Sequence, residues 1–114
     1  MSHPMKLVVV GAGGRMGRTL VRAISENRDV VLHAALEHAG SALIGQDAGS
    51  VAEIKPNGVM ISADPLAAIV EAHGILDFTV PDVSCGMAAF AAQARIVHII
   101  GTTGFEDKHL HRLE

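Results

Sequence analysis

Short apolar runs alternate with segments of helical spacing along this chain of 114 residues. Several of the runs are continuous rather than alternating, as is typical of parallel strands that are covered on both faces. Strands separated by helices predict an α/β fold, a doubly wound parallel sheet with right-handed crossovers. The apolar runs place the strands at Lys6–Val10, Val30–Leu36, Val59–Ile61, Ile75–Phe78 and Ile96–Ile100.

Helices are predicted between these strands. The first begins directly after the glycines near residue 14. The second has Asp64 as its N-cap, Pro65 in its first turn and Gly74 at its end. The third begins at Pro81 or Asp82. Helical spacing gives their buried faces in turn as Met16, Leu20, Ala23 and Ile24, then Leu66, Ile69, Val70 and His73, then Val83, Met87, Phe90, Ala91 and Ala94.

Two remaining segments carry weaker patterns. Residues 39–58 hold several glycines and predict an irregular loop with one helical turn at Ser41–Ile44. At the other end, Glu106 and Asp107 suit the first turn of a helix. No signal for a helix end follows before Glu114, so we expect the chain to be a fragment of a longer protein.

The most informative segment is KLVVVGAGGRMG, from Lys6 to Gly17. A strand that ends in glycines and passes directly into a helix is the pattern of a dinucleotide-binding turn. Gly11 allows a sharp turn off the strand, and Gly17 lets the helix pack close to it. Gly13 and Gly14 clear the space in which a pyrophosphate would approach the backbone and the helix N-terminus.

An acidic residue stands where such a site needs one. Glu37 follows the second strand, twenty positions after Gly17, which is the spacing at which a carboxylate binds the adenine ribose. Its oxygens can accept hydrogen bonds from both ribose hydroxyls. The alternative interpretation is a tight turn between strand and helix, followed by an unrelated acid.

Composition argues against several other functions. The formal net charge is −3 and no stretch concentrates Lys and Arg, so we expect neither nucleic acid nor a membrane as a partner. No apolar run has transmembrane length. Cys85 is the single cysteine, which fits a cytoplasmic location. The seven histidines are scattered without ligand spacing, so no metal site is expected.

Two further segments lie at the predicted C-terminal ends of strands, where ligands bind in open α/β sheets. The first is DFTVP at residues 77–81, and the second is GTTGF at residues 101–105. Glycines allow close backbone approach, and threonine hydroxyls donate or accept hydrogen bonds. Each segment alone is equally consistent with ordinary turn chemistry between a strand and a helix.

Together with GAGGRMG and the segment Ala35–Glu37, these segments resemble the bacterial 4-hydroxy-tetrahydrodipicolinate reductases, also called dihydrodipicolinate reductases. Residues 40–49 are also similar to the loop that follows the acidic residue in that family. The resemblance extends from Lys6 to Phe105. It implies a Rossmann-type dinucleotide-binding domain, and the NAD(P)H-dependent reduction of a cyclic imine dicarboxylate in lysine and diaminopimelate synthesis.

The resemblance also implies which residues bind the cofactor. The glycine turn would hold its phosphates and Glu37 its adenine ribose. Thr79 would lie near the nicotinamide ribose, and residues 101–103 would hold the carboxamide. The complete set of expected cofactor-binding residues is Gly11, Gly14, Arg15, Met16, Gly17, Glu37, His38, Phe78, Thr79, Gly101, Thr102 and Thr103.

The choice between NADH and NADPH depends on charge. The family often has arginine where this chain has His38, and some relatives have arginine in place of Val80. Both differences remove a fixed positive charge, and Glu37 repels a 2′-phosphate, so NADH is the favoured cofactor. Histidine gains charge as the pH falls towards about 6, which should narrow the preference. Alternatively, Arg15 or Arg18 reaches the 2′-phosphate and keeps NADPH binding strong at every pH.

The family's catalytic histidines, catalytic lysine and substrate contacts lie in a second, downstream domain that also forms a homotetramer. We therefore expect no catalytic residue in this chain, and no turnover by the chain alone. Two alternatives stay open, an NAD(H)-sensing regulatory module and the N-terminal domain of another two-domain oxidoreductase, such as a sugar dehydrogenase. The absence of tyrosine excludes a short-chain dehydrogenase. The absence of a Gly-Lys-Ser/Thr segment argues against a P-loop NTPase.

Overall fold

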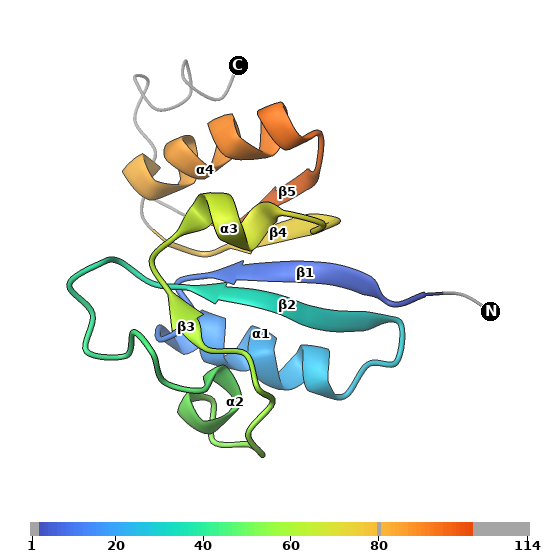
Figure 1. Ribbon diagram of the computed structural model, residues 1–114, viewed down its shortest axis with the longest axis vertical. Coiled ribbons are helices and arrows are strands. Elements are labelled where there is room, and N and C mark those ends of the chain that lie inside the picture. Colours follow the sequence, from blue (N-terminus) through green and yellow to red (C-terminus); the bar gives the residue numbers. More distant parts are fainter. Residues whose placement is uncertain (1–2, 80, 102–114) are drawn as a thin grey trace.

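Apolar runs form the strands of a parallel sheet in the computed structural model, which describes residues 3–79 and 81–101 (Figure 1). The strands of this part are β1 (Met5–Val10), β2 (Val30–Leu36), β3 (Ile61–Ser62), β4 (Gly74–Asp77) and β5 (Val97–Ile100). Their order in the sheet is β3-β2-β1-β4-β5. The chain moves outward from β1 to β3 and then returns to the other side of β1, which is the doubly wound arrangement. The predicted fold class is therefore confirmed.

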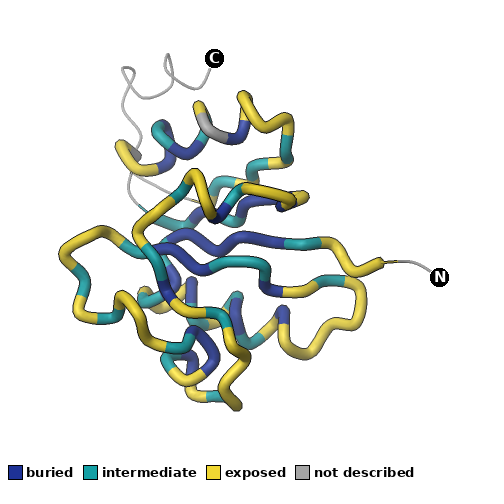
Figure 2. The backbone as a smooth tube through the Cα atoms, in the orientation of Figure 1, coloured by how far each residue is buried: buried dark blue, intermediate teal, exposed yellow. Residues whose placement is uncertain are grey.

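Helices cover both faces of the sheet (Figure 1). One face carries α1 (Arg15–Ser25) and α2 (Ala48–Val51), and the other carries α3 (Pro65–Ile69) and α4 (Pro81–Ala94). Each face has its own apolar core, with Val9 in one and Val8 in the other. Both side chains are completely buried, and the central strands are the most deeply buried part of the chain (Figure 2). Double coverage explains why β1 is a continuous apolar run.

The buried face of α1 differs from the prediction. Met16 is 45% exposed and Ala23 is also exposed. A Cβ atom on Gly17 would overlap the carbonyl oxygen of Gly11, so this contact decides which side of the helix faces the sheet. Successive helical residues are about 100° apart, which turns Met16 outward. The residues that α1 directs towards the core are Gly17, Leu20, Val21 and Ile24.

The start of α3 is confirmed and Ile69 packs on the core as predicted, but the rest of the predicted face and the end of the helix are wrong. Asp64 is the N-cap, and its carboxylate accepts the Ala67 amide at 3.2 Å. The side chains of Leu66 and Val70 are 59% and 62% exposed, whereas two alanines, Ala68 and Ala72, are buried. Apart from Ile69, the predicted face is wrong because small residues fit against α4 and the sheet in place of the predicted large ones.

The helix ends at Ile69 because the chain must join β1. Glu71 has a positive φ of 65°, and the His73 amide already donates to the Lys6 carbonyl at 2.8 Å. Gly74, predicted as the end of the helix, is instead the first residue of β4. This long-range contact has no signal in the local spacing.

In α4, Met87 and Ala91 are buried as predicted, but Val83 and Ala94 are exposed. Ser84, the next residue after Val83, is buried instead. The side chain of Phe90 lies outside the described part, as does the helix expected near the C-terminus. None of the described helices is long and apolar enough to cross a membrane.

The loop after β2 is organised by Asp47, which sequence analysis missed. Its carboxylate accepts the amides of Ser50, Asn57 and Gly58, at 3.0, 3.1 and 2.8 Å. Burial raises the pKa of Asp47, but these backbone hydrogen bonds together lower it by more. The pKa of Asp47 therefore lies below its ordinary value. The α-helical turn therefore begins after Asp47, whereas the predicted segment Ser41–Ile44 forms a hydrogen-bonded turn in which the Ile44 amide donates to the Ser41 carbonyl at 3.4 Å.

Candidate cofactor-binding site

The turn after β1 is held by backbone groups. The amides of Gly11 and Ala12 both donate to the Leu36 carbonyl, at 2.9 and 3.0 Å, and the Gly14 amide donates to the Gly11 carbonyl at 3.0 Å. Gly11 has a φ of 81°, a left-handed conformation that favours glycine. The sharp turn predicted at Gly11 is confirmed.

The other glycines of this turn differ in what surrounds them. A Cβ atom on Gly17 would overlap the Gly11 carbonyl oxygen, so the predicted close packing is confirmed. A Cβ atom on Gly14 would meet only that same oxygen, at 3.4 Å, which leaves open space beside Gly14. Gly13 has no such open space beside it. A Cβ atom added there would overlap the Leu43 side chain and approach Glu37 Oε2 at 3.1 Å, so these two neighbours require glycine at this position.

Glu37 is fixed beside the glycine turn. Its Oε2 accepts the Gly13 amide at 2.8 Å, and its own amide donates to the Ser62 carbonyl at 2.9 Å. Its Oε1 lies 3.3 Å from the His38 amide. Within the described part of the chain, no Lys, Arg or His forms an ion pair with this carboxylate. Glu37 is therefore an anchored acceptor at the end of β2.

The turn after β4 is held by a buried carboxylate that sequence analysis did not select. Asp77 Oδ1 accepts the hydroxyl of Thr79 at 2.6 Å and its amide at 3.2 Å. Asp77 Oδ2 lies 3.0 Å from His98 Nε2, and both side chains are buried. Nδ1 of His98 is also buried and has no hydrogen-bond partner among the described residues. A lone acid ending an apolar strand, and a lone histidine within the next one, were the available signals.

The pKa of Asp77 reflects these contacts. Burial raises the pKa of the carboxyl, but hydrogen bonds from His98, Thr79 and Ser84 and the charge of His98 outweigh that effect. The pKa of Asp77 therefore lies below its ordinary value of 3.8. The ionised form keeps the hydroxyl of Thr79 in place.

The two turns meet at the C-terminal edge of the sheet. A Cβ atom on Gly11 would come within 2.8 Å of Thr79 Cγ2. On the far side, the Gly101 amide donates to the Asp77 carbonyl at 2.8 Å, and Gly101 packs so closely on the Phe78 ring that no side chain would fit. Three segments from distant parts of the sequence are thus in contact.

A pocket of about 630 Å³ lies across these segments. Ala63, Pro65, Val83 and Met87 form an apolar wall of the pocket that sequence analysis missed. The helix predictions had assigned the last two to the core instead. Six of the predicted cofactor-binding residues line it, namely Gly11, Gly14, Glu37, His38, Phe78 and Thr79.

The other predicted residues that the structure describes do not line this pocket. Arg15 lines a separate cavity beside the glycine turn. Met16 is exposed and lines neither cavity, while Gly17 is buried beneath the turn. Val80, Thr102 and Thr103 lie outside the described residues. Within residues 3–79 and 81–101, no three His, Cys, Asp or Glu side chains are grouped so that they could hold a metal ion.

A glycine turn that opens a helix, a carboxylate after the second strand, and a pocket across the ends of β1 and β4 define a dinucleotide-binding domain of the Rossmann type. The family model described as dihydrodipicolinate reductase, N-terminus, matches residues 5–114. This chain therefore belongs to the dihydrodipicolinate reductase family. Membership of this family decides against the alternative of another two-domain oxidoreductase.

Curated relatives agree with the family model. The chain is 52% identical over 109 residues to a 4-hydroxy-tetrahydrodipicolinate reductase of Rhizobium meliloti, covering 96% of this chain and 45% of the relative. It is 57% identical over 110 residues to that of Beijerinckia indica, covering 96% of this chain and 41% of the relative. The chain thus spans less than half the length of these relatives.

Solved structures agree on the fold. A dipicolinate-bound dihydrodipicolinate reductase from a Paenisporosarcina species has a TM-score of 0.71 at 23% identity, covering 97% of this chain and 42% of that one. An aspartate semialdehyde dehydrogenase with NADP from Candida albicans also has a TM-score of 0.71, at 17% identity, covering 89% of this chain and 30% of that one. These likenesses support the Rossmann-type fold.

Proposed function

We propose that this chain is the cofactor-binding part of an enzyme that reduces 4-hydroxy-tetrahydrodipicolinate to tetrahydrodipicolinate in lysine and diaminopimelate synthesis. The observation that carries the proposal is the pocket of about 630 Å³, because six predicted cofactor-binding residues from three separate segments line it. When bound, the nicotinamide ring supplies the hydride, and the protein binds and orients it.

The residues present fit a dinucleotide. Open space beside Gly14 admits a pyrophosphate. The first amides of a helix have no intrahelical acceptor, and in α1 these belong to Arg15 and Met16. The exposed Met16 side chain does not obstruct this role, because the role uses its backbone. At the other end of the pocket, Thr79 is oriented by Asp77 beside the expected position of the nicotinamide ribose.

The Glu37 carboxylate is placed to bind the adenine ribose. One oxygen is engaged by the Gly13 amide, and the carboxylate retains acceptor capacity for the ribose hydroxyls. A negative charge here repels a 2′-phosphate, so we infer that NADH binds more tightly than NADPH near neutral pH. The neighbouring His38 lines the same pocket.

Binding should be lost in Gly14→Val. Because a Cβ atom on Gly14 meets nothing nearer than 3.4 Å, the variant should fold while its side chain fills the space needed by the phosphates. Calorimetric titration with NADH checks this, with thermal unfolding as the measure of folding. Gly86→Ala is the matched control, since a Cβ atom there meets nothing within 4 Å. Unchanged NADH affinity in Gly14→Val would refute the assignment of the glycine turn.

We further propose that substrate contacts, proton donation and the tetramer interface belong to a second domain. The curated relatives support this division, because this chain covers only 37–45% of their lengths. The chain alone should therefore show no substrate-dependent NADH oxidation above background, since proximity and orientation of the substrate are missing. Robust turnover by a verified 114-residue species would contradict the division.

A further inference from the structure

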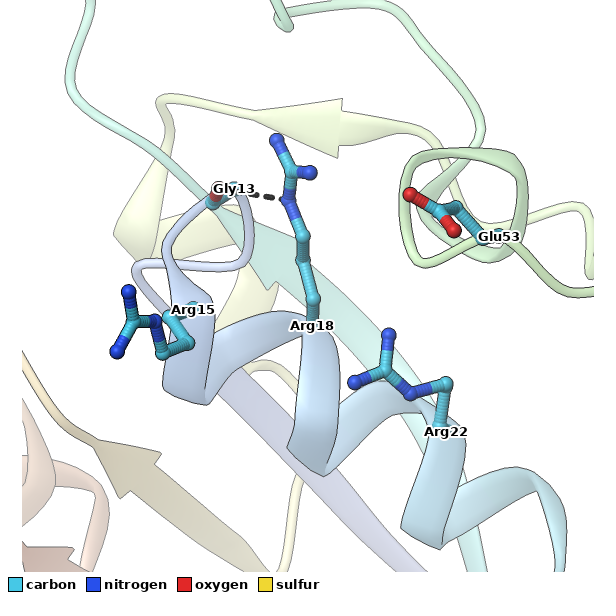
Figure 3. A pocket seen from close by; sticks show the side chains of 5 residues that line it. All are labelled: Gly13, Arg15, Arg18, Arg22 and Glu53. Atoms are coloured by element: carbon cyan, nitrogen blue, oxygen red, sulfur yellow. Dashed lines mark hydrogen bonds between the residues drawn. The ribbon is translucent and has the colours of Figure 1, made fainter.

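A second cavity, of about 410 Å³, lies on the outer side of the glycine turn. It is lined by Gly13, Glu53 and three arginines, Arg15, Arg18 and Arg22, that α1 presents on successive turns. Arg18 runs past Gly13 in the centre of the cavity, Arg22 lies on the side of Glu53, and Arg15 points away at the start of the helix (Figure 3). The main cofactor pocket does not include this cavity.

The charges of these arginines are not neutralised by carboxylates in the described part of the chain, where the ion pairs are Lys6–Glu71 and His98–Asp77. Glu53 lines the cavity but forms no ion pair there. The guanidinium groups of Arg18 and Arg22 are instead held by neutral oxygens. Arg22 donates to the Ala52 carbonyl at 3.1 Å and to Thr19 Oγ1 at 3.2 Å. A cavity with unpaired guanidinium groups favours an anion.

Arg18 connects this cavity to the cofactor site through a single residue. Its Nε donates to the Gly13 carbonyl at 2.9 Å, while the Gly13 amide donates to Glu37 Oε2 at 2.8 Å. The Arg18 guanidinium and the Glu37 carboxylate are therefore anchored to the two sides of Gly13. A ribose bound by Glu37 would have its 2′-oxygen near this boundary.

We propose that Arg18 binds the 2′-phosphate of NADPH and so allows the site to accept NADPH despite Glu37. This inference rests on the proposed function. The bond from Nε fixes the plane of the guanidinium, and its two terminal NH2 groups remain as a fork that matches phosphate oxygens. NADH still binds more tightly, because the carboxylate of Glu37 suits a free diol.

The other cations are less suited to this role. Arg22 lies one turn further along α1 and is tied to Ala52 and Thr19. Arg15 is exposed and points away from Arg18 (Figure 3). His38 is also exposed and lines the main pocket rather than the arginine cavity. Arg18 is partly buried and is the one of these side chains that bonds to the glycine turn.

The test compares Arg18→Gln with Arg28→Gln, which removes the same charge from an exposed position beyond α1. Dissociation constants for NADH and NADPH are measured by calorimetry on the 114-residue chain. Loss of a charge-assisted hydrogen bond should weaken NADPH binding by roughly tenfold or more. NADH binding should change by less than about twofold, and Arg28→Gln should leave both nearly unchanged.

Adenosine 2′,5′-bisphosphate and 5′-AMP isolate the phosphate, because they differ in that group alone. Arg18→Gln should weaken binding of the bisphosphate relative to 5′-AMP by roughly tenfold, and Arg18→Lys should restore part of that loss. Equal weakening of NADH and NADPH would overturn the proposal, because Arg18 would then only support the turn through Gly13. Unchanged NADPH binding would also overturn it. Failure of the unaltered chain to bind NADH would instead count against the proposed function.

Discussion

The turns after β1 and β4 meet at the same pocket, but they are held by different kinds of interaction. The turn after β1 depends on glycine geometry and on backbone amides that donate to the Leu36 carbonyl. The turn after β4 depends on Asp77, a buried carboxylate that pairs with His98 and positions Thr79. The first turn is therefore sensitive to shape, whereas the second is sensitive to protonation.

The largest effect should come from breaking the shape of the first turn with Gly17→Val. The added side chain would overlap the Gly11 carbonyl oxygen, a backbone atom that cannot move aside without distorting the turn. We expect the free energy of unfolding to fall by at least about 3 kcal/mol, at the upper end for overpacking. Urea denaturation measures this, with Gly86→Ala as the control. A loss below about 1 kcal/mol would mean that α1 can shift away from β1.

A smaller loss is expected from removing the charge that holds the second turn. Asp77→Asn replaces an acceptor-only group by an amide, which cannot accept both the Thr79 hydroxyl and His98 with the same geometry. We expect about 2 kcal/mol of lost stability and weaker NADH binding. Asp29→Asn, at an exposed position, provides the matched control. If Asp29→Asn lowers the free energy of unfolding as much as Asp77→Asn does, the buried pair of Asp77 and His98 has no special role in stability.

The stabilities of Gly17→Val and Asp77→Asn should also depend differently on pH. The folded pKa of Asp77 is lowered, so its contribution to stability is complete above its ordinary, unfolded pKa of 3.8. That contribution is lost as the pH falls through the folded value. The stability difference between the unaltered chain and Asp77→Asn should therefore shrink below about pH 4, while the deficit of Gly17→Val persists. Denaturation at several pH values tests this, and a constant difference for Asp77→Asn would contradict it.

The smallest effect concerns His38, beside the first turn. At pH 7.5, His38→Gln should change the ratio of NADPH to NADH affinity by less than about twofold, because the exposed side chain lines the main pocket and not the arginine cavity. Titrations of both cofactors with the variant and with the unaltered chain measure this ratio. A larger change would give His38 a part in the choice between the cofactors.

Sequence patterns were reliable for the strands and the glycine turn, because both have strong local causes. Continuous apolar runs identified β1 and β2, and the spacing from Gly17 to Glu37 selected the carboxylate that lies against the glycine turn. Helix rotation was less accessible, because the apolar residues of α1 surround more than one face. The contact between Gly17 and Gly11 turns Val21 towards the core and Met16 towards solvent. Because this contact joins the helix to the turn before it, the spacing within the helix does not reveal it.

Side-chain interactions across the fold could not be read from spacing. Asp77 and His98 lie 21 positions apart, and they become partners only because β4 and β5 pair in parallel. The sequence offers either Arg15 or Arg18 for the 2′-phosphate. The bond from Arg18 to the Gly13 carbonyl, which distinguishes the two, depends on how the helix sits on the turn.

The strand order also has a kinetic consequence. β1 and β4 are neighbours in the sheet, yet Lys6 in β1 and His73, directly before β4, are in contact across 67 positions of the chain. Closing so large a loop is slow compared with forming α1 or pairing β1 with β2. Because Phe78 and Thr79 reach the pocket only after β4 has joined β1, the recovery of NADH fluorescence during refolding would follow completion of the sheet rather than formation of its first half.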